Sequence, residues 1–166
     1  PHIKTRLKSN PKDAEAWLEL GQAHLVCEKY EWSLNAYEKV TALRPEDPKG
    51  YLGRGEALRM LDRFKEAIET YTRTISLSPE CWEAWVGRAR CKRHLEDHPG
   101  TIADLSQAIE GDPGKGEYWR RRADIRFENR DWAAAVAEAN AGAAKAPATA
   151  KVAPNPAPER AALPMD

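Results

Sequence analysis

The sequence predicts an all-α protein built from repeated pairs of antiparallel helices. Five prolines recur at one constant interval, at Pro11, Pro45, Pro79, Pro113 and Pro147. Aromatic residues keep the same interval, at Trp17, Tyr51, Trp85 and Trp119, and so do small residues, at Gly21, Gly55, Ala89 and Ala123. Self-similarity at a fixed period of roughly 20–50 residues is typical of solenoids, in which each repeat is one supersecondary unit.

These residues resemble those of a known family. A 34-residue period that carries W-x2-L-G, then Ala, then an aromatic residue and then Pro is similar to the tetratricopeptide repeat, or TPR. The first unit shows the pattern best, with Trp17, Leu20, Gly21, Tyr37 and Pro45. The resemblance covers residues 1–149. It implies a right-handed α-solenoid of helix-turn-helix units, whose first helices line a concave groove.

The period divides the chain into units that are expected to fold alike. Residues 1–13 are expected to be the end of a preceding, truncated repeat helix, and residues 150–166 an irregular tail rich in Ala and Pro. Proline ends the second helix of each unit because it cannot continue a helix. The four units between these ends are predicted at 14–47, 48–81, 82–115 and 116–149.

Some elements need a separate argument. Pro99 suits the first position of the second helix in the third unit, where its missing N–H costs nothing, and Asp97 or His98 would cap that helix. The last helix is expected to run to about Lys145. Gly55 is expected to allow a close approach of the second helix at Ala67.

Several side chains receive a predicted environment. We expect substantial burial of Trp17, Trp85 and Trp119. The position of Leu20 holds arginine in the later units, at Arg54, Arg88 and Arg122, and we expect these to send their heads to water. The acidic residues Asp97, Asp104 and Glu110 are interpreted as a solvated face.

Composition excludes several classes of function. The chain has 26 basic and 26 acidic residues, so zero net charge argues against a nucleic-acid partner or an anionic membrane surface. No apolar run approaches the length of a membrane span, and residues 1–13 do not resemble a signal peptide. Three cysteines without a C-x-x-C motif favour a reducing compartment. The expected protein is soluble and cytoplasmic.

Motifs of catalysis are absent from the sequence. It contains no phosphate-binding loop, H-E-x-x-H, G-x-S-x-G or dinucleotide fingerprint, so we expect no enzymatic activity and no cofactor. Cys91, His94 and His98 are the one candidate zinc set, because i, i+3, i+7 spacing places them on one helical face. The alternative, which we favour, is that Cys91 packs in the interior and His98 lies in the turn.

The predicted function is a protein-interaction scaffold that binds a peptide or a partner helix in the groove. The lining changes from apolar to basic along the array, so the expected partner carries aliphatic and acidic residues. The candidate groove residues are Leu18, Gln22, Leu25, Leu52, Glu56, Arg59, Arg90, Arg93, Arg120 and Arg121. The alternative is a structural module that self-associates by end-to-end stacking.

One TPR subclass is not matched. Cochaperone TPR domains clamp chaperone C-terminal carboxylates with Lys, Asn and Arg at set positions of their first helices. In this sequence those positions hold Leu18, Gln22, Gly53, Glu83 and Gly87, and none of them matches. One unit later, only Arg121 does.

Overall fold

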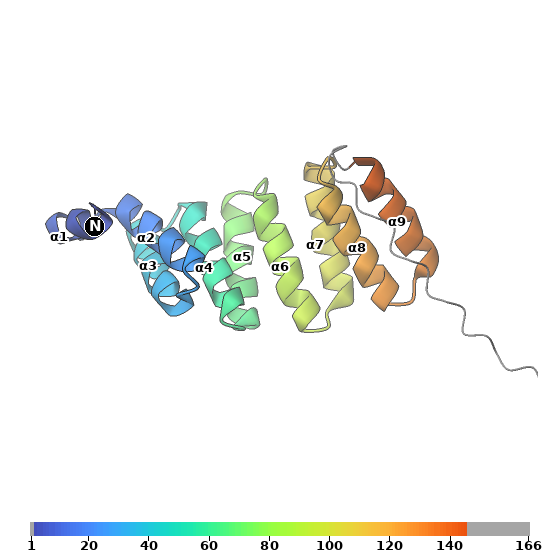
Figure 1. Ribbon diagram of the computed structural model, residues 1–166, viewed down its shortest axis with the longest axis horizontal. Helices are drawn as coiled ribbons and strands as arrows, with labels where there is room; N and C mark the ends of the chain where they lie inside the picture. The colour runs from blue at the N-terminus through green and yellow to red at the C-terminus, as the bar shows by residue number, and fades with distance from the viewer. Residues whose placement is uncertain (1, 146–166) are drawn as a thin grey trace, which may run out of the picture.

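The computed structural model describes residues 2–145, which form nine helices and no strand (Figure 1). In chain order they are α1 His2–Ser9, α2 Ala14–Val26, α3 Tyr30–Leu43, α4 Pro48–Met60, α5 Phe64–Leu77, α6 Trp82–His94, α7 His98–Gly111, α8 Gly116–Glu128 and α9 Trp132–Lys145. The predicted all-α fold is confirmed. The expected tail, 150–166, lies outside the described residues.

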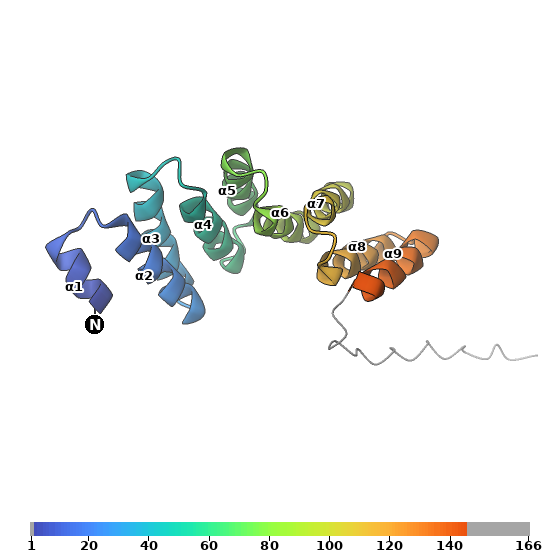
Figure 2. The same cartoon turned by 90° about the horizontal axis from the view of Figure 1, so that it is seen from above.

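Consecutive helices pack as antiparallel pairs, and the pairs stack side by side along the long axis of the molecule (Figure 1). Seen from above, the row of helices follows a curved path (Figure 2). The first helices also touch across units, α2 against α4 and α4 against α6. One helix pair falls within each predicted unit. The unit boundaries themselves stay a prediction, because helix positions alone do not divide a continuous array.

Helix ends follow the local sequence. The Asp97 carboxylate accepts a hydrogen bond from the Gly100 N–H at 2.9 Å, and Pro99 lies in the first turn of α7, as expected. Asp13 and Asp47 cap α2 and α4 in a similar way. An N-cap acceptor satisfies one of the backbone donors that a helix start leaves free. α9 reaches Lys145, the last residue that the structure describes, so the place where it ends stays a prediction.

Two tyrosines on second helices are each clamped between two glycines. A Cβ built on Gly21 would lie 3.0 Å from the Tyr37 ring, and one on Gly53, in the next unit, 2.2 Å from it. Tyr71 has the same arrangement, with 2.8 Å at Gly55 and 2.5 Å at Gly87. A Cβ would therefore clash with the ring at Gly53, Gly55 and Gly87, and would be in tight contact with it at Gly21. A Cβ on Gly55 would meet the Tyr71 ring, and the expected close approach at Ala67 stays a prediction.

The periodic tryptophans and prolines are joined by hydrogen bonds. The indole N–H groups of Trp17, Trp85 and Trp119 donate to the carbonyl oxygens of Pro11, Pro79 and Pro113 at 2.9, 2.9 and 3.1 Å. These bonds hold each tryptophan at the loop that precedes its helix. The three residues are partly exposed but have most of their surface covered, which agrees with the expected burial.

Buried ion pairs link the two helices of the third unit. The Arg88 guanidinium donates twice to the Asp104 carboxylate, from Nε at 2.9 Å and Nη2 at 2.7 Å, and Lys92 Nζ lies 2.9 Å from the same group. Asp104 is 2% exposed. Two predictions are therefore wrong: Arg88 does not send its head to water, and Asp104 does not belong to a solvated face.

The fourth unit repeats this ion cluster at the equivalent positions. Arg122 Nε lies 3.1 Å, and Arg126 Nε 2.7 Å, from the Glu138 carboxylate, which belongs to a residue 8% exposed. Arg122 therefore also departs from the expected solvated position. The second unit has Thr70 where the carboxylate would stand. Arg54 consequently lacks this partner, and its Nε is buried without a hydrogen bond.

Candidate peptide-binding groove

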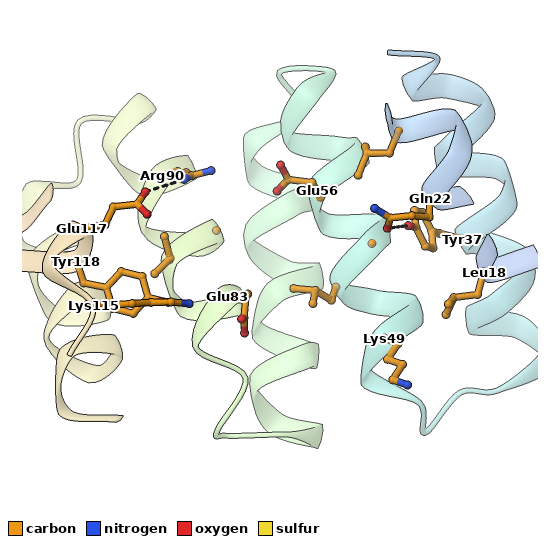
Figure 3. Close-up of a pocket in the computed structure, with 15 residues that line it drawn as sticks. Leu18, Gln22, Tyr37, Lys49, Glu56, Glu83, Arg90, Lys115, Glu117 and Tyr118 are labelled. Carbon is orange, nitrogen blue, oxygen red and sulfur yellow. Dashed lines mark hydrogen bonds and ion pairs between the residues drawn. The ribbon is translucent and has the colours of Figure 1, made fainter. Parts of the chain in front are cut away.

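A groove with a volume of about 520 Å³ runs along the face formed by α2, α4, α6 and α8 (Figure 3). Apolar side chains alternate in it with charged groups of both signs. Its lining comprises Leu18, Gln22, Leu25, Tyr37, Lys49, Leu52, Gly53, Glu56, Glu83, Val86, Gly87, Arg90, Lys115, Glu117 and Tyr118. A concave, mostly apolar surface with a few polar groups is the usual form of a binding site.

Six of the ten predicted groove residues line this surface: Leu18, Gln22, Leu25, Leu52, Glu56 and Arg90. The other four are arginines placed elsewhere. Arg59 pairs with Glu56, Arg93 with Glu128, and Arg121 with Glu117, while Arg120 is exposed outside the groove. The expected basic half of the groove is therefore largely neutralised by the protein's own carboxylates.

The predicted groove set omitted residues that the structure places in the lining. Tyr37 reaches it from α3, a second helix, through the gap that Gly53 leaves open. Lys115 and Tyr118 come from the start of α8, where the Lys115 Nζ donates to the Tyr118 hydroxyl at 3.2 Å. One signal in the sequence could have identified Tyr37 as a lining residue: it precedes Gly53 by the same interval as Tyr71 precedes Gly87.

Two polar groups of the groove are held by tyrosines beneath them. The Tyr37 hydroxyl donates to Gln22 Oε1 at 3.2 Å (Figure 3), and the Tyr71 hydroxyl donates to Glu56 Oε2 at 2.8 Å. Burial, with a smaller contribution from Glu56, raises the pKa of Tyr37 to about 12, so its hydroxyl stays protonated. Burial opposes ionisation of Glu56, but hydrogen bonds from Arg59 and Tyr71 outweigh it and lower its pKa.

Arg90 differs from these fixed groups. Burial lowers its pKa, and the nearby guanidinium groups of Arg121 and Arg59 lower it further. Its Nε is buried and has no hydrogen-bond partner. The Glu117 carboxylate faces it at 3.7 Å, which is beyond hydrogen-bond range (Figure 3).

The candidate zinc residues do not converge. Cys91 is fully buried, and burial raises the pKa of its thiol to about 12. The His94 ring stacks on Phe64 of the preceding unit, with centroids 4.4 Å apart and planes 6° from parallel. His98 begins the next helix. Within residues 2–145, no three His, Cys, Asp or Glu side chains are grouped as metal ligands.

No helix in the described part of the chain is both long and apolar enough to cross a membrane.

The groove lies on the concave side of an α-solenoid built from stacked helix pairs. A solenoid of this kind creates an extended concave face from many short, similar helices.

Comparison with known proteins identifies the solenoid. The family model of the tetratricopeptide repeat matches residues 28–75 and 61–115, which together span more than half of the chain. The chain belongs to the tetratricopeptide repeat family. Members of this family are generally non-catalytic scaffolds for other proteins. No curated protein matches the chain by sequence.

Solved structures of TPR proteins share the fold. MamA superposes with a TM-score of 0.82 at 20% identity, covering 86% of this chain and 84% of that one. YrrB, described as a TPR protein with an unusual peptide-binding site, gives 0.75 at 18% identity, with 89% and 76% covered. TTC0263 of Thermus thermophilus gives 0.74 at 20% identity, with 89% and 81% covered. Identities this low show the fold alone.

Proposed function

We propose that this protein is a non-catalytic interaction scaffold that binds an extended peptide or a partner helix in the concave groove. The observation that carries the proposal is the groove of about 520 Å³, to which all four units contribute side chains. The peptide-binding site named for the TPR protein YrrB supports it as an analogy of fold.

Apolar contact would supply most of the affinity. Leu18, Leu25 and Leu52 line the groove on α2 and α4, and Val86 continues this surface on α6. Burial of apolar area stabilises a complex by roughly 25 cal/mol per Å² before the costs of association. The partner would therefore place aliphatic side chains on the first two units, as the sequence analysis expected.

The test is a peptide selected from a random displayed library by the wild-type protein, then titrated against two variants. Leu18→Asp is expected to weaken binding about tenfold, because it puts a charge where an aliphatic side chain would be buried. Leu43→Asp is the matched control, since Leu43 is 37% exposed and lies outside the groove. Equal binding by both variants would place the peptide on another surface.

A second candidate function is end-to-end association of two copies. Between the last two units, Arg93 pairs with Glu128. Phe127 stands one repeat after Arg93 and is 60% exposed. Val26 stands at the first-unit position equivalent to Glu128 and is 74% exposed. These apolar residues would meet if one copy continued the array of another in repeat register.

This continuation makes a demand on α1. In the sequence, α1 (His2–Ser9) stands four periods before residues 138–145 of α9. If one copy continued the array of another, α1 of the second copy and α9 of the first would need the same place. α1 would therefore have to move. Sedimentation velocity over a range of concentrations tests the idea. Wild type is expected to show concentration-dependent association that Phe127→Glu abolishes and Leu43→Asp leaves intact. A wild-type monomer at all concentrations would reject stacking.

A further inference from the structure

Arg90 occupies a repeated position on the floor of the groove. Gln22, Glu56 and Arg90 stand one full repeat apart from each other, on α2, α4 and α6. In the first two units, a tyrosine hydroxyl from the second helix holds this side chain, from Tyr37 or Tyr71. The third unit departs from the pattern, because the equivalent of those tyrosines is a leucine.

Leu105 is that leucine, and it has no hydroxyl to offer. It is 2% exposed and lies with Arg90 in the wall of a small cleft beside the groove. The Arg90 Nε consequently remains buried without an acceptor. An unpaired buried donor costs free energy that a bound acceptor would recover.

The charges around Arg90 leave one positive charge uncompensated. Three guanidinium groups, those of Arg59, Arg90 and Arg121, face two carboxylates, Glu56 and Glu117. Each carboxylate already has a closer cation: Arg59 is paired with Glu56, and the Arg121 Nε donates to Glu117 at 2.9 Å. Of these three arginines, Arg90 is therefore the one with the weakest protein partner, at 3.7 Å from Glu117.

A hydrogen-bond acceptor of a bound partner could occupy the small cleft. Arg90, Arg93 and Arg121 line it above Leu105 and Ile125, and its volume of about 20 Å³ is enough for one water-sized group. Arg90 belongs both to this cleft and to the main groove. The cleft therefore adjoins the groove at Arg90.

We propose that Arg90 binds a carboxylate of the peptide that occupies the groove. This inference deepens the proposed function and rests on it. A single carboxylate balances the single excess charge. A phosphate, with about two charges, would exceed that excess. The partner is therefore an aliphatic segment that carries one Asp, Glu or C-terminal carboxylate at α6.

Orientation follows from the positions of these groups. The aliphatic lining lies on α2 and α4, at Leu18, Leu25 and Leu52, and Arg90 lies on α6. Arginine grips carboxylates with two parallel N–H donors, which fixes direction as well as adding affinity. The peptide would accordingly lie across the first helices, with its acidic group at the third unit.

The experiment repeats the library selection with three proteins: wild type, Arg90→Leu and Arg120→Leu. Arg120 is the matched control, because it is an exposed arginine of the array outside the groove. One library displays peptides internally and a second displays free C-termini, which separates side-chain from terminal carboxylates. Wild type and Arg120→Leu are expected to enrich aliphatic peptides with one acidic group, and Arg90→Leu to lose that acidic preference.

Titration of one enriched peptide supplies the quantitative test. Arg90→Leu, or replacement of the acidic group by its amide, is expected to weaken binding about 10- to 100-fold, as for a hydrogen bond to a charged group. Both changes together are expected to cost little more than either alone. Arg90→Leu should unfold at the wild-type temperature or above, because it removes an unpaired buried donor.

The outcomes separate this inference from the proposed function. Enrichment of peptides without an acidic group, or equal binding of acidic peptides by Arg90→Leu, overturns the role of Arg90 and leaves the groove as the binding site. A failure of all three proteins to enrich any peptide overturns both. A marked loss of stability in Arg90→Leu would instead assign Arg90 a structural role and contradict the inference.

Discussion

Replacing Asp104 with leucine is expected to destabilise the protein by about 3 kcal/mol, since breaking a buried ion pair by removing one partner costs about 3–5 kcal/mol. The substitution leaves the cations of Arg88 and Lys92 facing an apolar side chain between α6 and α7. The lower end applies because the Arg88 and Lys92 side chains retain 14% and 19% exposure and can turn partly toward water. Urea unfolding at neutral pH measures the change.

Two further variants make this prediction specific. Glu110→Ala, on the exposed side of the same helix, is expected to change stability by less than about 0.5 kcal/mol. Adding Arg88→Leu to Asp104→Leu should recover part of the loss, since apolar residues can replace a buried pair at little cost. If Asp104→Leu and Glu110→Ala unfold alike, the ion cluster contributes nothing to the array.

Replacing Gly53 with alanine is expected to cost about 1–3 kcal/mol, although alanine is the better helix former by about 1 kcal/mol. The new methyl group would lie 2.2 Å from carbon atoms of the Tyr37 ring. The ring cannot easily retreat, because Gly21 borders it on the other side. Contact between the first two units would therefore have to open. Thermal or urea unfolding measures the effect.

The control is Gly114→Ala, in a turn between α7 and α8, where the nearest atom would be at an ordinary 3.5 Å. The array itself suggests a suppressor: Leu105 of the third unit and Arg121 of the fourth stand at the positions equivalent to Tyr37 and Gly53. Tyr37→Leu should therefore relieve much of the strain of Gly53→Ala. Wild-type stability of Gly53→Ala alone would mean that the tyrosine clamp is not a tight contact.

The constant period of the sequence was enough to predict the helices and the family. Proline recurs in every repeat and tryptophan in three of the four, because each has a task at a fixed place near a helix end. Pro45, for example, comes just after the end of α3, and Asp97 caps α7 by accepting from the nearby Gly100 N–H. Such tasks are set by neighbours in the chain, so spacing alone reveals them.

The repeat spacing did not predict which side chains of different helices contact each other. The sequence suggested that Arg88 and Asp104 were both solvated, because each charge is favourable in water when considered alone. Tertiary packing brings them together from α6 and α7, and the ion pair then offsets the cost of burial. The same reason explains the groove, where six candidates line the concave surface and four arginines lie elsewhere.

The four arginines outside the groove show which properties follow from the sequence and which depend on the tertiary structure. The face of a helix on which Arg93 or Arg121 sits follows from the period, and it is determined by the sequence. Whether its charge remains available to a partner depends on which carboxylate lies opposite, and only the tertiary structure placed Glu128 and Glu117 there. Arg90 stays unmatched because Leu105 replaces a tyrosine on a different helix, a relation that a one-dimensional pattern does not contain.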